Sequence, residues 1–194
     1  MIYKNQTFSG NDLKGQDIEN SRFINCKFDN SPLRFSSFTK CEFVTCDLSL
    51  SIFDITSFSN CHFPESKLSN LNFSDAKIKK CTFEKSIMRN CIFQQMKGGS
   101  NSGHKNIDLS ECIFEDSELT GAVFIFCYLK GVNFKKANLE NASFDRCNLK
   151  EADFTGANIT RTNFANSRIE ETLLDLDGFI TFGNSKGFIL EQQK

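Results

Sequence analysis

Large apolar residues recur at every fifth position of this chain. Steps of five from Phe8 to Phe93 give 18 positions, and every one is Phe, Leu, Ile or Met. Steps of five from Leu109 to Leu174 give 14 more, all Phe, Leu or Ile. A β-strand has a period of two and an α-helix a period of 3.6, so neither element alone produces this spacing. The repeat predicts a solenoid, built from one small structural unit used many times.

The other positions of the repeat indicate how each unit folds. The residue two places before each large one is mostly Ser, Cys, Thr or Ala. In an extended segment these two residues point to the same side, so both are expected in the interior. Because five is odd, the chain must turn once per repeat to keep the next large residue inside. The residue two places after each large one is predicted at that corner, where the left-handed conformation favours Gly and Asn. They fill 13 of the 31 such sites.

A longer period of 20 residues gives the number of faces per coil. Steps of 20 across the chain align seven phenylalanines: Phe23, Phe43, Phe63, Phe83, Phe114, Phe134 and Phe154. A second column is also dominated by Phe, whereas the two columns between them are mostly Leu, Ile and Met. A step of 15 mixes these classes. Four faces per coil therefore fit best, and 18 plus 14 repeats predict about eight four-faced coils.

The repeat is interrupted once, by the segment QQMKGGSNSGHKN. The alternation of Phe and aliphatic faces sets the size of this insertion. Phe93 must be followed by an aliphatic face, and Leu109 provides it if 11 extra residues loop out at a corner. The Gly and Ser residues of the segment cannot pack a core. A loop insertion at about residues 94–106 is therefore predicted.

The repeats ANLEN, ADFTG, ANITR and CNLKE resemble the pentapeptide-repeat family, whose pattern is small, polar, Leu or Phe, and two variable residues. The resemblance covers Thr7 to Leu174 and implies an all-β fold, a right-handed quadrilateral parallel β-helix. The N-terminal repeats, single looped-out segment and non-repeat tail are also similar to the quinolone-resistance members of this family. That similarity implies binding to a type II topoisomerase such as DNA gyrase, through a rod that imitates the charge and width of duplex DNA.

The charge distribution bears on this mimicry. The net charge is −1, so no global field favours direct binding to nucleic acid or to a membrane. Residues 1–93 carry 12 basic and 10 acidic side chains, a net charge of +2, whereas residues 106–174 carry 7 and 11, a net charge of −4. The acidic half fits mimicry, but ordinary solvation of a polar surface explains it equally simply and is the favoured interpretation.

No catalytic constellation, cofactor motif or metal site is predicted, so the protein is not expected to be an enzyme. His62 and His104 have no evident nucleophile or carboxylate partner. All nine cysteines occupy the small inward position, where stacked thiols lack the tetrahedral geometry of a zinc site and the spacing of a disulfide. They are predicted to be buried free thiols. A cytoplasmic location is expected, because free thiols suit a reducing compartment and no membrane span or secretory signal is evident.

Most outward positions are polar, but one set of apolar residues maps to a single wall or its edges, the wall with Phe53, Phe93 and Phe124 inside. This set, called the apolar wall below, is Phe35, Leu50, Ile52, Ile55, Ile92, Val123, Ile125 and Phe126. Exposed apolar surface indicates a partner or a cover. The wall, without Leu50, and the loop residues Met96, Lys97, His104 and Lys105 are the candidates for binding a protein partner. Alternatively, the loop folds back through Met96 over Ile92 and Phe126.

The repeat ends at Leu174, and residues 175–194 form a separate tail. Its apolar runs flank the letters GNSKG, which predicts a β-hairpin, and its glycines argue against a long helix. An open coil end exposes unpaired strand edges, so the tail is expected to cap its own rod or to pair with a second copy. Dimerisation is common in the family and is the favoured interpretation. The candidate residues are Phe179, Ile180, Phe182, Phe188, Ile189 and Leu190.

The sequence thus predicts a β-helical rod over residues 1–174 and a capping or dimerisation tail over residues 175–194. The expected function is non-catalytic binding, with a type II topoisomerase as the candidate partner and quinolone action as the process modulated. The alternative is a structural or scaffolding module with an unknown protein partner. A strongly negative stripe along one wall would support the first hypothesis, and an uncovered apolar wall would support the second.

Overall fold

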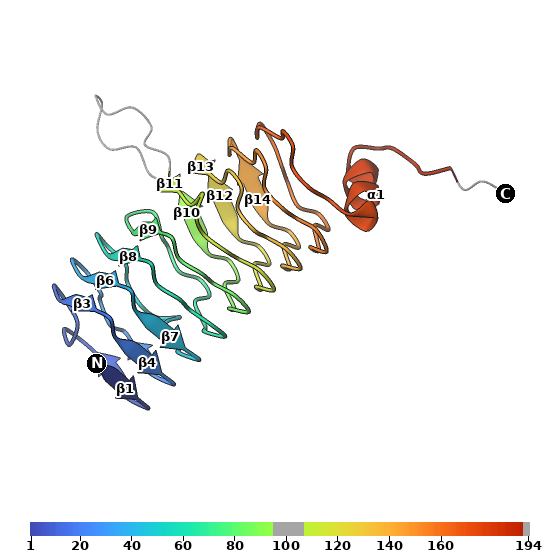
Figure 1. Ribbon diagram of the computed structural model, residues 1–194. Coiled ribbons are helices and arrows are strands. Elements are labelled where there is room, and N and C mark those ends of the chain that lie inside the picture. Colours follow the sequence, from blue (N-terminus) through green and yellow to red (C-terminus); the bar gives the residue numbers. More distant parts are fainter. Residues whose placement is uncertain (95–106, 192–194) are drawn as a thin grey trace, which may run out of the picture.

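The computed structural model describes residues 1–94 and 107–191, which form an elongated rod of short parallel strands with one helix at its C-terminal end (Figure 1). Each strand lies beside the strand one coil away. The strands are β1 (Ile2–Lys4), β2 (Thr7–Ser9), β3 (Asp17–Glu19), β4 (Arg22–Ile24), β5 (Lys27–Asp29), β6 (Ser37–Thr39), β7 (Glu42–Val44), β8 (Ser57–Ser59), β9 (Lys77–Lys79), β10 (Ile92–Gln94), β11 (Ile107–Asp108), β12 (Val123–Ile125), β13 (Cys127–Tyr128) and β14 (Ser143–Asp145). The predicted parallel β-helix is confirmed.

The register of strand pairing is 20 residues, as a four-faced coil requires. Tyr3 pairs with Phe23, and Phe23 with Phe43. Isolated bridges continue the same face to the end of the rod. The outward residues that succeed one another on this face are Ile2, Arg22, Glu42, His62, Thr82, Ile113, Asn133, Asp153 and Leu173. Eight steps connect these nine levels, which agrees with the predicted number of coils.

One step on each of three faces is longer than the others. Thr82 pairs with Ile113, and Phe93 pairs with Phe124. Each of these steps spans 31 residues, which is 11 more than one coil. The alternation of Phe and aliphatic faces predicted this shift, and the Phe93–Phe124 pair shows that it preserves the aromatic column.

Most corner positions adopt the left-handed backbone conformation that the sequence predicted. Positive φ angles recur two places after the large inward residue, from Gly10 at 53° to Glu171 at 55°. Lys, Glu, Thr and Arg also adopt this conformation at some corners, although it costs an L-residue about 1–2 kcal/mol. The coil therefore imposes this angle at most of its corners whichever residue is present, and Gly or Asn only lowers its cost.

Two long ladders of aromatic rings run through the core. In the first, Phe23 and Phe43 have ring centroids 4.8 Å apart with planes 6° apart. In the second, Phe93 and Phe124 have centroids 4.8 Å apart with planes 1° apart. The two ladders meet edge to face, as Phe114 does with Phe124 at 84°. Both arrangements are favoured by the ring quadrupole, and neither leaves a polar group to satisfy, which explains why Phe is used in place of Tyr or Trp.

The small inward residues have a second role besides their size. Ser66 Oγ donates a hydrogen bond to the Phe43 carbonyl at 2.6 Å, and Cys61 Sγ donates one to the Phe38 carbonyl at 3.3 Å. Both bonds span 23 residues, so each reaches the large inward residue of the preceding coil. Thr162 makes the same bond to Leu139 at 2.8 Å. Side-chain donors thus connect neighbouring coils inside the rod, which explains the preference for Ser, Thr and Cys over Ala.

The tail contains the helix α1 (Leu176–Ser185), so the predicted hairpin is wrong. Asp175 is the N-cap, with its side chain accepting a hydrogen bond from the Gly178 amide. The letters GNSKG are the end of the helix, because Gly187 has a φ of 87° and the Phe188 amide donates to the Gly183 carbonyl. Left-handed glycine is a common helix terminator, and a hairpin turn has the same composition. Within residues 1–94 and 107–191, no helix is long and apolar enough to cross a membrane.

Candidate protein-binding surfaces

The structure divides the apolar wall into two clusters. The lower cluster is Phe35, Leu50, Ile52 and Ile55, with side chains between 42% and 61% exposed. The upper cluster is Ile92, Val123, Ile125 and Phe126; Ile92 is 37% exposed and the other three are partly buried. Asn72 follows Ile52 by the 20 residues of one coil and pairs with Ile92 of the next coil. Polar Asn72 and Ser74 therefore lie between the two clusters. Strand pairing keeps Ile92 and Val123 on the same wall, whereas the division into two clusters was not evident from the sequence.

Two members of the lower cluster occupy strained corners. Phe35 has a φ of 62° and Ile55 a φ of 53°, and both corners belong to the same column. A β-branched residue is among the least suited to this conformation. Ile55 therefore carries a conformational cost while its side chain remains 61% exposed. Apolar side chains that cost stability without being buried make this cluster a candidate contact surface.

The upper cluster lies beside the insertion and has charged contacts. The Arg146 guanidinium stands over the Phe126 ring at 5.2 Å from its centroid. Phe126 is also at a corner, with a φ of 55°. The candidates Met96, Lys97, His104 and Lys105 lie outside the described residues, so the interpretation that the loop covers this cluster stays a prediction. His62, the other histidine, points outward with Nδ1 2.8 Å from Thr82 Oγ1.

About half of the acidic side chains on the described rod are paired with basic ones, mostly from neighbouring coils. The pairs include Arg22–Glu42, Arg34–Asp54, Lys80–Glu111, Arg89–Glu118, Lys130–Glu151, Lys135–Asp153 and Lys150–Glu170. Glu118 lies in the region of densest acidity. Its partial burial opposes ionisation, but hydrogen bonds from Thr120 and Asn138 outweigh this and hold its pKa below the usual value. Over the described residues, these pairs interrupt every wall, so no strongly negative stripe forms.

The nine thiols are buried and free. Burial raises the pKa of the Cys91 and Cys112 thiols to about 12, so both stay protonated at neutral pH. A protonated thiol is a poor nucleophile and a poor metal ligand. Within the part of the chain that the structure describes, no group of three or more His, Cys, Asp or Glu residues is placed to hold a metal ion.

The tail candidates divide into an inner and an outer face. Phe182 packs against the rod, with its ring centroid 5.9 Å from that of Phe164. Phe179 is 59% exposed, and the segment after the helix is more so, with Ile189 at 92%. A shallow groove joins these outer residues; its lining is Leu176, Phe179, Ile180, Gly183, Asn184, Phe188, Ile189 and Leu190. The inner face therefore caps the rod, while the outer face leaves apolar side chains exposed.

A parallel four-faced solenoid with a turn every five residues defines a class of repeat proteins that display surfaces on a rigid scaffold. Two family models match this chain, one for a pentapeptide repeat region over residues 100–174 and one for eight copies of pentapeptide repeats over residues 56–95. The chain belongs to the pentapeptide-repeat family. No curated protein sequence matches it.

Solved structures of the family share this fold. A trypsin-treated form of QnrB1, described as a plasmid-mediated fluoroquinolone resistance protein, has a TM-score of 0.67 and 19% identity, covering 99% of both chains. Full-length QnrB1 has a TM-score of 0.50 and 18% identity, covering 96% of this chain and 97% of its own. At this level of identity the similarity shows a common rod along nearly the whole length.

Proposed function

We propose that this protein is a non-catalytic binding module that holds a protein partner through the apolar wall. The observation that carries the proposal is the lower cluster, where Phe35 and Ile55 are exposed at strained corners. Neither side chain contributes to the core, and Asn or Gly would suit both corners better. Rigid solenoids of this class bind through extended surfaces, which fits a row of apolar side chains along one wall.

The candidate partner is a type II topoisomerase such as DNA gyrase, and the candidate effect is modulation of quinolone action. Similarity to the quinolone-resistance members and the common fold with QnrB1 support this choice. The paired charges do not support imitation of duplex DNA, because no wall of the described rod has an unbroken acidic stripe. Contact through the apolar wall is therefore the favoured mode of binding. A structural or scaffolding role would use the same wall with a different partner.

The protein is further proposed to form a homodimer through its tail and to act in the cytoplasm. The outer face of α1 and the segment after it expose Phe179, Phe188 and Ile189 together. Burying such a surface against its own copy is the simplest way to cover it in a symmetric assembly. The cytoplasmic location is supported by nine free cysteines, because reducing compartments keep thiols unpaired.

The test is DNA gyrase supercoiling with and without a quinolone, titrating the wild type and three variants. The first is the double variant Phe35→Asn and Ile55→Asn, which keeps corner-compatible residues and removes the apolar side chains. The matched control is Thr45→Asn, a β-branched corner with a φ of 49° on the opposite edge of the rod. The third deletes residues 97–105. We expect wild type and control to protect or inhibit the enzyme, and the double variant to act at least about tenfold more weakly.

Each result decides a different part of the proposal. A wild type without effect across the titration would exclude the topoisomerase and leave the scaffolding role. A double variant that acts like the Thr45→Asn control would show that the apolar wall is not the contact surface. Loss of activity in the deletion variant alone would place the contact at the loop. Analytical ultracentrifugation of Phe188→Ser together with Ile189→Ser tests the dimer separately, and the proposed dimer is wrong if their sedimentation equals that of the wild type.

A further inference from the structure

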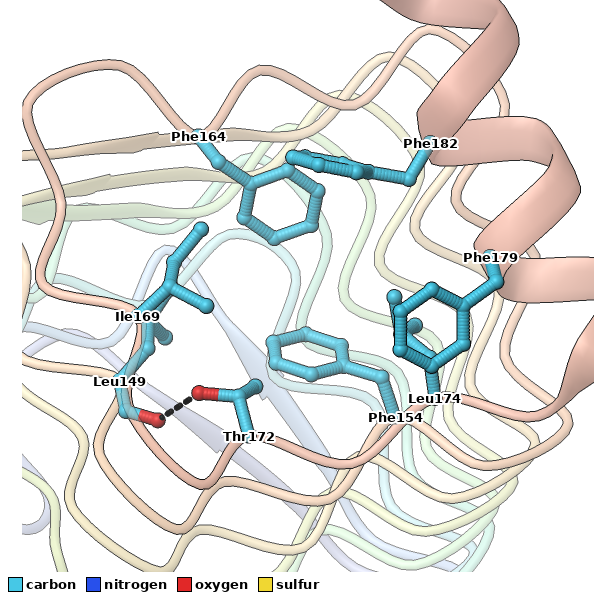
Figure 2. A pocket seen from close by; sticks show the side chains of 8 residues that line it. All are labelled: Leu149, Phe154, Phe164, Ile169, Thr172, Leu174, Phe179 and Phe182. Carbon is cyan, nitrogen blue, oxygen red and sulfur yellow. Dashed lines mark hydrogen bonds between the residues drawn. The ribbon is translucent and has the colours of Figure 1, made fainter.

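An unfilled space lies between the last coil and α1, and Figure 2 shows the side chains around it. Its volume is about 100 Å³, and its lining is Leu149, Phe154, Phe164, Ile169, Thr172, Leu174, Phe179 and Phe182. Phe182 reaches down from α1 to meet Phe164 edge to face, at 67° between the planes. Ile169 and Phe179 are 50% and 59% exposed, so these two side chains flank the side that opens to solvent.

The space exists because both aromatic ladders end before the cap closes over them. Phe134 stacks on Phe154 with ring centroids 5.0 Å apart. One coil further on, the corresponding residue is Leu174, which follows the paired residue Leu173 and is smaller and not planar. The second ladder ends at Phe164, whose next aromatic neighbour is the Phe182 ring at a steep angle in place of a stacked one. The rings of Phe154 and Phe164 thus border the unfilled space.

The chemistry of the lining selects an uncharged ligand. Among the eight lining residues, Thr172 has the only polar side-chain atom, and its Oγ1 already donates to the Leu149 carbonyl at 2.8 Å. A water molecule needs two to four polar partners to occupy such a site, whereas an apolar cavity of about 150 Å³ stays dry and binds benzene. The lining offers ring faces, ring edges and methyl groups, which are the contacts that a planar aromatic molecule uses.

We propose that this space is a binding site for a small, uncharged, planar aromatic molecule of one ring. The ligand lies against Phe154 and Phe164 and beneath Phe182, at the place of the next ring in the stack. A polar substituent on the ligand points to the open side between Ile169 and Phe179. Because the site has walls on both the rod and α1, the bound molecule favours the docked position of the helix. The inference does not depend on the identity of the protein partner.

The test uses fluorobenzene and the full chain, with binding followed by the fluorine NMR signal of the ligand. Two variants fill the space from different sides: Leu174→Phe continues the ladder, and Ile169→Phe narrows the opening. The matched control is Leu173→Phe, which adds the same ring at a neighbouring position that is 52% exposed and faces outward. We expect saturable binding to the wild type and the control, and at least about tenfold weaker binding to either filled variant that retains the wild-type thermal transition.

Three outcomes would overturn the proposal. One is the absence of saturable binding to the wild type. A second is equal affinity for the wild type and both filled variants, which would place the ligand elsewhere. The third is an affinity that falls as protein concentration rises, since a side chain from a second copy would then be the true occupant. An affinity independent of protein concentration, with the loss confined to the filled variants, supports the assignment.

Discussion

One carboxylate, that of Asp175, links the start of α1 to the rod. Its Oδ1 accepts a hydrogen bond from the Gly178 amide at 2.8 Å, which caps the helix. Its Oδ2 accepts one from the Gly156 amide, also at 2.8 Å. Elsewhere in the rod a corner amide donates to a backbone carbonyl 19 residues later, as Lys136 does to Thr155. Asp175 provides the same acceptor with its side chain, which allows the chain to leave the coil and begin a helix.

Two substitutions of Asp175 distinguish the contributions of its two hydrogen bonds to stability. Asp175→Ala removes both, and a lost N-cap of about 1 kcal/mol plus a lost charge-assisted hydrogen bond gives about 2–3 kcal/mol. Asp175→Asn keeps an oxygen for Gly178 but presents an amide group, a donor, to the Gly156 amide. We therefore expect Asn to cost roughly half as much as Ala. Asp177→Ala is the matched control, because that carboxylate interacts mainly with the helix dipole, for less than about 1 kcal/mol.

Hydrogen exchange measured by mass spectrometry reports the stability of α1 separately from that of the coils. For Asp175→Ala, amide protection across residues 176–185 should fall by about 30- to 150-fold, because each 1.4 kcal/mol is a factor of ten. Protection in the coils around Phe43 and Phe63 should stay unchanged, since each coil contacts only its neighbours. Unchanged exchange in α1 would refute the role of Asp175. Equal loss of protection along the whole rod would refute the local attachment.

Three further predictions concern a helix, a carboxylate and a thiol. Gly183→Ala should raise the stability of α1 by up to about 1 kcal/mol in the same exchange assay, because its new Cβ lies 3.7 Å from the nearest atom. Gly178→Ala should give no such increase in stability, because its Cβ would lie 2.9 Å from the Leu174 side chain. Glu118→Gln should flatten the fall in melting temperature on acidification. The lowered folded-state pKa makes Glu118 stabilising above its unfolded pKa of about 4.3, and the contribution is lost as pH falls through the folded pKa. Cys112 should react with a thiol reagent at pH 8 only at the rate of unfolding, and fast labelling of the native protein would contradict its burial.

The inward positions of the coil were predictable from the sequence, because the packing of the core restricts the residue type at each of them. A large apolar residue at every fifth position and a small one two places earlier suffice for the coil, its corners and its four faces. The 11-residue shift at the insertion followed from the same requirement, since Phe93 must stack on an aromatic ring and Phe124 provides it. The size of the small residue was also evident. The sequence did not show that this residue donates a hydrogen bond to the preceding coil, because Ser, Cys and Ala fit the same space.

The tail and the outward positions were harder to predict because several structures satisfy them. Phe179 and Phe182 occur once, without a period that decides between helix and hairpin, and Gly187 suits a helix end and a turn equally. Ion pairs such as Lys80–Glu111 join residues 31 positions apart, so they appear only when the register around the insertion is known. Their pairing removes the acidic stripe that the composition of residues 106–174 permits.

This difference between inward and outward positions supports assigning function to the apolar wall. The coil needs only its inward pair and a tolerable corner, so an outward residue can change without loss of the fold. At such a site the expected residue is polar, and at a corner it is Gly or Asn. Ile55 departs from both expectations at once, and Phe35 does the same one coil away. Because both side chains remain more than half exposed, the proposed contact with a partner gives them a role that the core does not.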